Sequence, residues 1–289
     1  MDQCYRSLHT ELVPLLDQIN CGPPKAITPV SGGCINRCFK VTAADKREFF
    51  FKTHKNPPPG FFQAEADGLR AIADTHCIRV PQVYALSEQG LLLEYLAPSP
   101  ADNSFWQQLG ENLASLHQTP APCFGFQHNN FCGLTPQPND MTDNGFDFFR
   151  QCRLMYQAEL ALSNHKLRQA DYDRVEKLCQ RLHELIPEQP PTLIHGDLWS
   201  GNIYCSAGEP VLIDPAAHWG WAEADIAMTF LFTSFSKVFY QSYYNNLRPK
   251  EGWQQRLELY NLYHLLNHLN LFGTSYRPPV REAIRRYVF

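Results

Sequence analysis

The sequence predicts an α+β protein of two lobes, a small antiparallel sheet with one packed helix followed by a larger, mainly helical part. Strand-like segments crowd the first third of the chain, whereas helical periodicity dominates after a connector at 97–102. The chain has 289 residues, which is more than most single hydrophobic cores hold. We therefore expect an N-terminal lobe over 1–96 and a C-terminal lobe over 97–289.

The first lobe is expected to begin with an amphipathic helix over 1–20, which the Cys-Gly-Pro-Pro run at 21–24 ends. A proline-rich break at 56–60 separates the early strands from a second helix over 61–74. The strands of this lobe are predicted at 26–30, 38–43, 48–53, 83–86 and 91–96, the last two as a hairpin.

The second lobe has helical periodicity in most of its length, interrupted by two short strands that end near 194 and 213. The segment 119–143 is rich in Pro, Asn and Gly, and we expect a long surface loop of the kind that is often functional. The helices are predicted at 103–118, 144–161, 169–185, 222–246, 253–272 and 279–287.

Composition excludes several classes of protein. A net charge of −4 argues against a nucleic-acid surface. The sequence contains no run of eighteen apolar residues and no evident secretory signal, so we expect neither a membrane span nor export, and a cytoplasmic location. The 10 cysteines are scattered without zinc-ribbon spacing, which favours free thiols in a reducing compartment.

The stretch LIHGDLWSGN at 193–202 places two polar side chains at a fixed distance after a short strand. Asp197 and Asn202 fit the spacing H-x-D-x-x-x-x-N, and Asp214 ends the next strand-like run. This order is the catalytic signature of protein kinases, in which the first acid is the base and the other two residues hold Mg²⁺. A turn in which these side chains only bind loop amides is the alternative.

A kinase-like site also requires partners in the first lobe, and the sequence supplies them in the required order. Lys52 directly follows the aromatic run of its strand, and Glu65 lies on the next helix, where it can pair with the lysine. Gly32, Gly33, Cys34 and Asn36 belong to a turn whose amides can approach phosphate. The segment Glu94, Tyr95 and Leu96 lies where a kinase hinge presents its backbone to adenine. Together these parts predict a protein-kinase-like fold.

Several blocks resemble the fructosamine (ketosamine) kinase family, within the superfamily of protein kinases and aminoglycoside phosphotransferases. They are HGDLWSGN, the IDPA at 213–216, GWAEADIAM at 220–228, FGFQHNNFCGLTPQPN at 124–139 and LYHLLNHLNLFG at 262–273. The resemblance runs from about residue 8 to the C-terminus. The Trp after HGDL and the 124–139 block are its more specific parts, since HGD with IDP alone also occurs in aminoglycoside and choline kinases.

The resemblance implies an ATP-dependent and Mg²⁺-dependent kinase of ketosamines, the adducts of sugars with amines or protein lysines. Phosphorylation of the hydroxyl on the third carbon makes the adduct unstable and releases the amine, a deglycation step. In this interpretation Asp197 is the base, Asn202 and Asp214 hold Mg²⁺, and Lys52 binds phosphates. The oligomeric state stays open between monomer and homodimer.

Further residues are candidates for supporting roles. His195 is expected to brace the catalytic loop, and Asp225 either caps its backbone or is only a favourable acid at a helix N-terminus. Trp199 and Trp219 are candidate walls for the sugar, with core packing as the alternative. His264 and His268 stand four residues apart on a helix, and we favour packing or pocket lining over a metal site because no third ligand is evident. Cys34, in the phosphate turn, is a candidate for redox control.

Two other functions remain compatible with these residues. The first is a kinase of another small hydroxyl substrate, such as an aminoglycoside or a choline-like alcohol. The second is a non-catalytic, nucleotide-binding scaffold, against which the intact set of Lys52, Glu65, Asp197, Asn202 and Asp214 argues.

Overall fold

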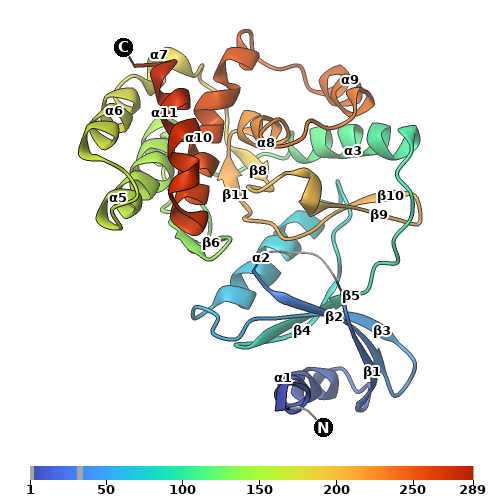
Figure 1. The fold of residues 1–289 in the computed structure, drawn as a ribbon. Helices are drawn as coiled ribbons and strands as arrows, with labels where there is room; N and C mark the ends of the chain where they lie inside the picture. Colours follow the sequence, from blue (N-terminus) through green and yellow to red (C-terminus); the bar gives the residue numbers. More distant parts are fainter. Residues whose placement is uncertain (1–2, 31–34, 289) are drawn as a thin grey trace.

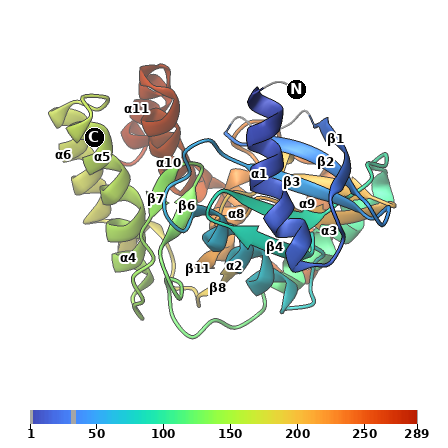
Figure 2. The same cartoon turned by 90° about the horizontal axis from the view of Figure 1, so that it is seen from below.

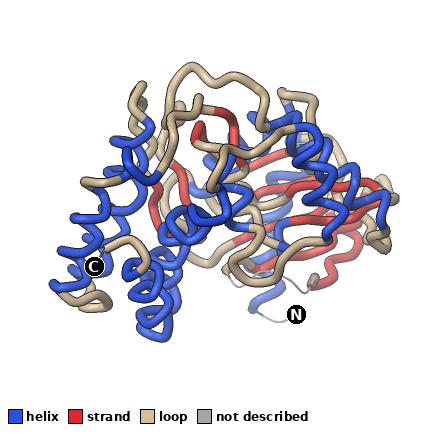
Figure 3. The backbone as a smooth tube through the Cα atoms, turned by 90° about the horizontal axis from the view of Figure 1, so that it is seen from above, coloured by secondary structure: helices blue, strands red, loops and turns tan. Residues whose placement is uncertain are grey.

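The computed structural model describes residues 3–30 and 35–288 and has the predicted two-lobe α+β architecture. The first part of the chain forms a sheet flanked by helices, and the rest forms a larger helical lobe above it in Figure 1. Most of the strands lie on the side of the N-terminus, and many of the helices lie on the side of the C-terminus (Figure 3).

The first lobe is built on one antiparallel sheet with the strand order β1-β2-β3-β5-β4. Each strand lies within two residues of its predicted position, and β4 and β5 form the predicted hairpin. The bounds are β1 (Pro24–Pro29), β2 (Arg37–Ala43), β3 (Glu48–Thr53), β4 (Val83–Ser87) and β5 (Gly90–Glu94).

A helix packs on each face of this sheet, and the alternation of side chains along the strands decides which face each residue meets. Helix α1 (Gln3–Gln18) crosses one face (Figure 2) and shares a core with Phe49 and Phe51. Helix α2 (Phe61–Ala73) belongs to the core of the other face, against which Phe50 packs. The even-numbered side chains of β3 therefore point toward α2.

The second lobe is arranged around the long helix α10, which contacts α5, α8 and α11. Four short strands pair as two ribbons, β8 with β11 and β9 with β10. The helices are α3 (Asn103–Leu116), α4 (Gly145–Phe148), α5 (Tyr156–Ser163), α6 (Gln169–Cys179), α7 (Leu182–Leu185), α8 (Ala222–Met228), α9 (Lys237–Asn246), α10 (Trp253–Phe272) and α11 (Arg277–Arg285). The strands are β6 (Asn130–Cys132), β7 (Thr135–Gln137), β8 (Thr192–Ile194), β9 (Ile203–Ser206), β10 (Glu209–Leu212) and β11 (His218–Gly220).

Three predicted helices are divided in the structure. The helix expected at 169–185 consists of α6 and α7, with a turn at 180–181 between them. The helix expected at 144–161 contains a π-helix, Phe149–Met155, between α4 and α5. The helix expected at 222–246 is broken into α8 and α9, because Ser236 accepts a hydrogen bond from the Val238 N–H and starts a new helix. The Tyr240 hydroxyl accepts from the Phe235 N–H and satisfies the backbone inside the break.

The segment 119–143 is mostly irregular, as predicted, but it does not lie wholly at the surface. This segment contains the hairpin of β6 and β7, and several of its side chains are buried, among them Phe124, Asn130, Gln137 and Asn139. Apolar periodicity cannot reveal such a segment, because its burial depends on amide side chains that hydrogen-bond inside the protein.

Across the described residues, no helix is both long and apolar enough to cross a membrane. The cysteines that the structure describes are free thiols, as the sequence predicts: Cys21, Cys38, Cys77, Cys123, Cys132, Cys152, Cys179 and Cys205.

We expect the substitution Gly110→Ala to destabilise the protein, although alanine is the better helix former by about 1 kcal/mol. A Cβ at this position in α3 would lie 2.6 Å from the Phe239 carbonyl oxygen and 2.8 Å from the Ser242 Cβ, both in α9. Such overpacking costs about 1–3 kcal/mol. Chemical denaturation measures the loss, and the exposed Gln108→Ala in the same helix is the control. Equal stability of the two variants would contradict close packing of α3 against α9.

Candidate active site

The catalytic-loop motif begins where β8 ends, and a glycine shapes its first turn. Gly196 has φ of +81°, and a Cβ there would lie 2.2 Å from the carbonyl oxygen of Ala216. Only glycine permits this conformation and this approach of two backbones. The turn therefore holds the loop that carries Asp197 against the segment that follows Asp214.

Asp197 and Asn202 are joined within the loop, as their spacing predicts. The Asn202 side chain is buried, and its Nδ2 donates to the Asp197 main-chain oxygen at 2.8 Å and to Asp197 Oδ2 at 3.1 Å. A short 3₁₀ turn over Ser200–Asn202 brings the amide back to the acid. Because Nδ2 makes both bonds, Oδ1 is the atom that Asn202 can offer to a cation.

The carboxyl group of Asp197 has an environment suited to proton transfer. Burial raises its pKa to about 7, the hydrogen bond from Asn202 opposes the rise, and the charges of Asp214 and Asp225 add to it. A carboxylate with a pKa near neutrality is a stronger base than an ordinary aspartate and is still largely ionised above pH 7.

His195 braces the loop through both ring nitrogens. Its Nε2–H donates to the Ile213 carbonyl at 2.9 Å, and its Nδ1 accepts from the Asp197 N–H at 3.2 Å. Burial lowers the pKa of His195, so the ring is neutral and can play both roles. The imidazole thereby connects the backbones that carry Asp197 and Asp214.

Asp225, at the start of α8, binds the backbone of the same loop. Its carboxylate accepts from the His195 N–H at 2.6 Å and the Gly196 N–H at 2.8 Å, and from His117 Nε2 at 3.2 Å. The other nitrogen of His117 accepts from the Tyr243 hydroxyl at 2.7 Å. Burial opposes ionisation of Asp225, but His117 and these hydrogen bonds lower its pKa overall.

Lys52 reaches the site from the first lobe because it is an even-numbered residue of β3 and faces α2. Its Nζ lies 2.8 Å from Glu65 Oε2 and 2.8 Å from Asp214 Oδ1. Both Lys52 and Glu65 are buried. Burial disfavours the ammonium ion, yet the carboxylates of Asp214 and Glu65 outweigh it and raise the pKa of Lys52. The lysine therefore stays charged and links the two lobes.

Asp214 has a backbone conformation that is uncommon outside glycine, with φ of +54°. It follows β10 by two residues, and its side chain is 40% exposed, far more than that of Lys52. The turn points one carboxylate oxygen at the lysine. Asn202 and Asp214 together offer an amide and a carboxylate oxygen, the hard donors that Mg²⁺ prefers.

The remaining nucleotide-side candidates are only partly described. Gly32, Gly33 and Cys34 lie outside the described residues, and Asn36 is half-buried. The Glu94 side chain is paired with Arg79, and the main-chain N–H of Glu94 donates to the Gln82 carbonyl at 2.8 Å. These bonds leave the backbone of Tyr95 and Leu96 as the better hinge candidates.

The two tryptophans proposed as sugar walls have different surroundings. Trp199 is partly exposed and meets Phe232 edge-on, and the Phe232 ring lies 5.2 Å from His268, so that an aromatic row extends beside the loop. Trp219 is partly buried and packs against Phe126 of the core, with ring centroids 5.4 Å apart. This contact favours the packing alternative for Trp219, which we leave out of the proposed substrate site.

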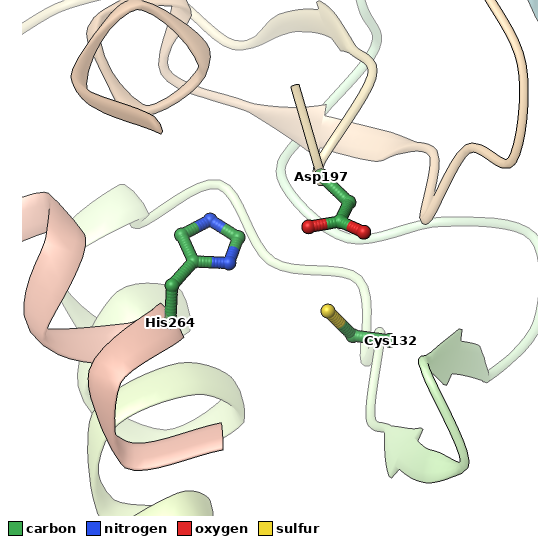
Figure 4. A group of neighbouring side chains, drawn as sticks. All are labelled: Cys132, Asp197 and His264. Carbon is green, nitrogen blue, oxygen red and sulfur yellow. The ribbon is translucent and has the colours of Figure 1, made fainter. Parts of the chain in front are cut away.

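His264 and His268 also have different surroundings. His268 Nδ1–H donates to the His264 carbonyl at 2.7 Å, so one of its ring nitrogens is used inside the helix. His264 is turned toward Asp197, together with Cys132, which sequence reasoning overlooked (Figure 4). The block at 124–139, which carries part of the family resemblance, was the signal that could have drawn attention to this cysteine.

The segment 119–143 supports the site through buried amides. Asn130 Nδ2 donates to the Ala217 carbonyl at 2.8 Å, and Gln137 Nε2 donates to the Ala216 carbonyl at 3.1 Å. Asn139 Nδ2 in turn donates to Asn130 Oδ1 at 2.8 Å. These bonds hold the chain just after Asp214.

This chain is similar to known proteins over most of its length. Residues 16–289 match the fructosamine kinase family. A probable ketoamine kinase of Synechocystis is 40% identical over 89% of this chain and 88% of its own length. The chloroplastic protein-ribulosamine 3-kinase of Oryza sativa is 37% identical over 91% of this chain and 78% of its own length. A solved structure from Thermobifida fusca, described as a fructosamine-3-kinase, has a TM-score of 0.88 at 29% identity and covers 95% of this chain and 96% of its own.

We expect Asp225→Asn to lower the free energy of unfolding at pH 7 by about 2–3 kcal/mol, because one of the buried N–H donors that the Asp225 carboxylate binds loses its charged acceptor. The folded pKa of Asp225 lies below its usual value of 3.8, so this stabilisation is full above that value and disappears as pH falls through the folded pKa. Denaturation curves of both proteins between pH 7 and acid pH test this. The exposed Asp173→Asn is the control, and a difference that persists undiminished in acid would contradict the assignment.

Proposed function

Because this chain belongs to the fructosamine kinase family, we propose that it transfers the γ-phosphoryl group of ATP to a ketosamine hydroxyl beside Asp197. The acceptor class is the set of sugar adducts of amines or protein lysines, with the hydroxyl on the third sugar carbon as the reacting group. The observation that carries this proposal is Lys52, which binds Glu65 and Asp214 at 2.8 Å each. A base and an oxygen-donor pair lie on the loops next to that contact.

The nucleotide site lies between a first lobe over 1–96 and a second over 97–289 in this proposal. Lys52 contributes a fixed ammonium ion for the α- and β-phosphates, and Glu65 holds it in place. Asp214 already occupies one side of the lysine, so phosphate oxygens would share the ammonium ion with that carboxylate. The backbone of Tyr95 and Leu96 would face adenine.

Asn202 and Asp214 fit a magnesium ion by the chemistry of their donors, an amide oxygen and a partly exposed carboxylate. When bound there, Mg²⁺ supplies charge neutralisation to the phosphates. The buried hydrogen bonds of Asn202 to Asp197 fix the amide, so that its free oxygen keeps one direction.

Asp197 is the proposed base. It accepts the proton of the acceptor hydroxyl as the oxygen attacks the γ-phosphorus, and the bond from phosphorus to the bridging oxygen of ADP breaks. His195 and Asp225 hold the loop backbone, so the carboxylate keeps its position while the proton moves. Most of the rate enhancement then comes from positioning and from charge, because phosphoryl transfer needs little covalent help.

Trp199, Phe232 and His268 form the proposed wall of the acceptor site. Their partly exposed rings can stack on the C–H face of a sugar, while hydroxyl groups turn toward Asp197 and His264. A free amine or the side chain of a protein lysine would extend outward from this wall.

A panel of acceptors with Mg-ATP tests the proposed function. We expect phosphorylation of fructosamine and ribulosamine adducts of lysine, measured as ADP release, with ³¹P NMR identifying the modified hydroxyl. Free lysine and an aminoglycoside are the negative acceptors. Turnover of the aminoglycoside without turnover of any ketosamine would refute the proposal.

The variant Asp197→Asn should reduce kcat by about 10²–10⁴-fold, the range attributed to a positioned general base. Nucleotide binding should survive, because Asp197 does not contact Lys52 in the proposed site. The exposed Asp143→Asn is the matched control. Full activity of Asp197→Asn would show that another residue accepts the proton.

The pH profile provides an independent check of the base. Because Asp197 must be ionised and its pKa lies at about 7, kcat/KM should fall as pH decreases, to about one tenth of its plateau at one pH unit below the midpoint. Initial rates with a ketosamine between pH 5.5 and 8.5 give the curve. A flat profile through pH 7 would contradict proton transfer to Asp197.

A further inference from the structure

Three side chains that could ligate a metal meet beside the proposed base, apart from the oxygen pair assigned to magnesium. Cys132 ends β6, Asp197 lies in the catalytic loop and His264 lies on α10, and one candidate ligand atom of each lies within 4.8 Å of the others (Figure 4). The three residues lie far apart in the sequence. For this reason the spacing of His264 and His268 alone does not reveal Cys132 and Asp197 as further ligands.

His264 has an unsatisfied nitrogen in this cluster. The residue is 5% exposed, and its Nδ1 is buried without a hydrogen-bond partner among the described residues. Figure 4 shows the imidazole edge turned toward Asp197 and Cys132. Unpaired buried polar atoms are rare in proteins and call for an explanation. Burial lowers the pKa of His264 to about 3, so the ring is neutral and has a lone pair to donate.

The donor set selects a class of ion. A thiolate sulfur, an imidazole nitrogen and a carboxylate oxygen are ligands of Zn²⁺ and of similar divalent metals, whereas Mg²⁺ prefers oxygen alone. In a tetrahedral zinc site with usual bond lengths, ligand atoms lie about 3.5 Å apart. Side-chain adjustments of about an ångström would close the cluster from its present spacing around an ion, and the fourth position would take water.

We propose that Cys132, Asp197 and His264 form an inhibitory site for Zn²⁺ or a chemically similar divalent metal. Binding releases the proton of the Cys132 thiol to solvent and engages the Asp197 carboxylate as a ligand. A carboxylate bound to metal cannot accept the proton of the acceptor hydroxyl. The inhibition rests on the proposed function: Asp197, the partly exposed member of the cluster, is also the group that the acceptor hydroxyl must reach, so the ion and the acceptor exclude each other.

Metal binding is tested without any activity measurement. Co²⁺ is titrated into the full chain in the absence of Mg²⁺, and thiolate-to-cobalt absorption in the near ultraviolet is recorded. We expect one equivalent to bind to the wild type and to Cys179→Ser, a buried thiol that belongs to no such cluster among the described residues. The band should vanish in Cys132→Ser, and His264→Gln should weaken cobalt binding at least about tenfold.

Inhibition is tested with free zinc held at fixed concentrations during ketosamine turnover. Zinc should raise KM for the ketosamine and leave KM for ATP unchanged, and a chelator should restore activity. Each variant is normalised to its own metal-free rate. The zinc concentration for half inhibition should rise at least about tenfold in Cys132→Ser and in His264→Gln, with circular dichroism showing that each is folded.

The outcomes separate the two proposals. Cobalt absorption that persists in Cys132→Ser, or equal zinc inhibition of wild type and both variants, would overturn the metal site. The cobalt band without turnover of any ketosamine would refute the proposed function and leave the metal site standing. Should Cys132→Ser fail to fold, unchanged cobalt binding by His264→Gln overturns the site on its own.

Discussion

The buried ammonium ion of Lys52 is the contact on which the rest of the site depends. It bridges Glu65, on the helix that packs against the sheet, and Asp214, in the other lobe, at 2.8 Å each. Removing one member of a buried ion pair typically costs about 3–5 kcal/mol, because the remaining charge has no partner. That cost applies to the buried pair of Lys52 and Glu65, whereas the side chain of Asp214 is 40% exposed and solvent partly screens its charge. The relative position of the lobes is thereby coupled to the position of Asp214.

A second buried carboxylate fixes the other half of the site. Asp225 accepts hydrogen bonds from the backbone on which Asp197 lies, and His117 and Tyr243 continue the chain of bonds into α3 and α9. These two helices pack closely at Gly110. Asp197, the proposed base, is therefore held by a helical framework before any substrate binds. Such pre-organisation reduces the rearrangement required when charge develops on the acceptor oxygen.

The sequence predicts those parts of the site that depend on residues close together in the chain. Lys52 follows from its aromatic strand, and Asp197, Asn202 and Asp214 follow from spacing, because short distances along the chain constrain geometry. The positions of Cys132 and His117 could not be predicted, since their neighbours lie far away in the sequence. The sequence leaves Trp219 open between a sugar wall and core packing, because a tryptophan near a motif does not reveal which face of its strand is buried. The sequence predicts a surface loop at 119–143 because amides that pair with one another look the same in sequence as amides that face water.

The close approach of Gly196 to the Ala216 carbonyl has a consequence for how the family can diversify. Two backbones in contact leave no room for either loop to shift separately. Asp197, the proposed base, and Asp214 therefore move as a single rigid unit. New acceptors cannot be accommodated by reshaping that unit. In the proposed site, new acceptors would instead be accommodated by the aromatic row of Trp199, Phe232 and His268, whose side chains are partly exposed. Selection for different glycated amines would then leave the chemistry unchanged and alter only this row.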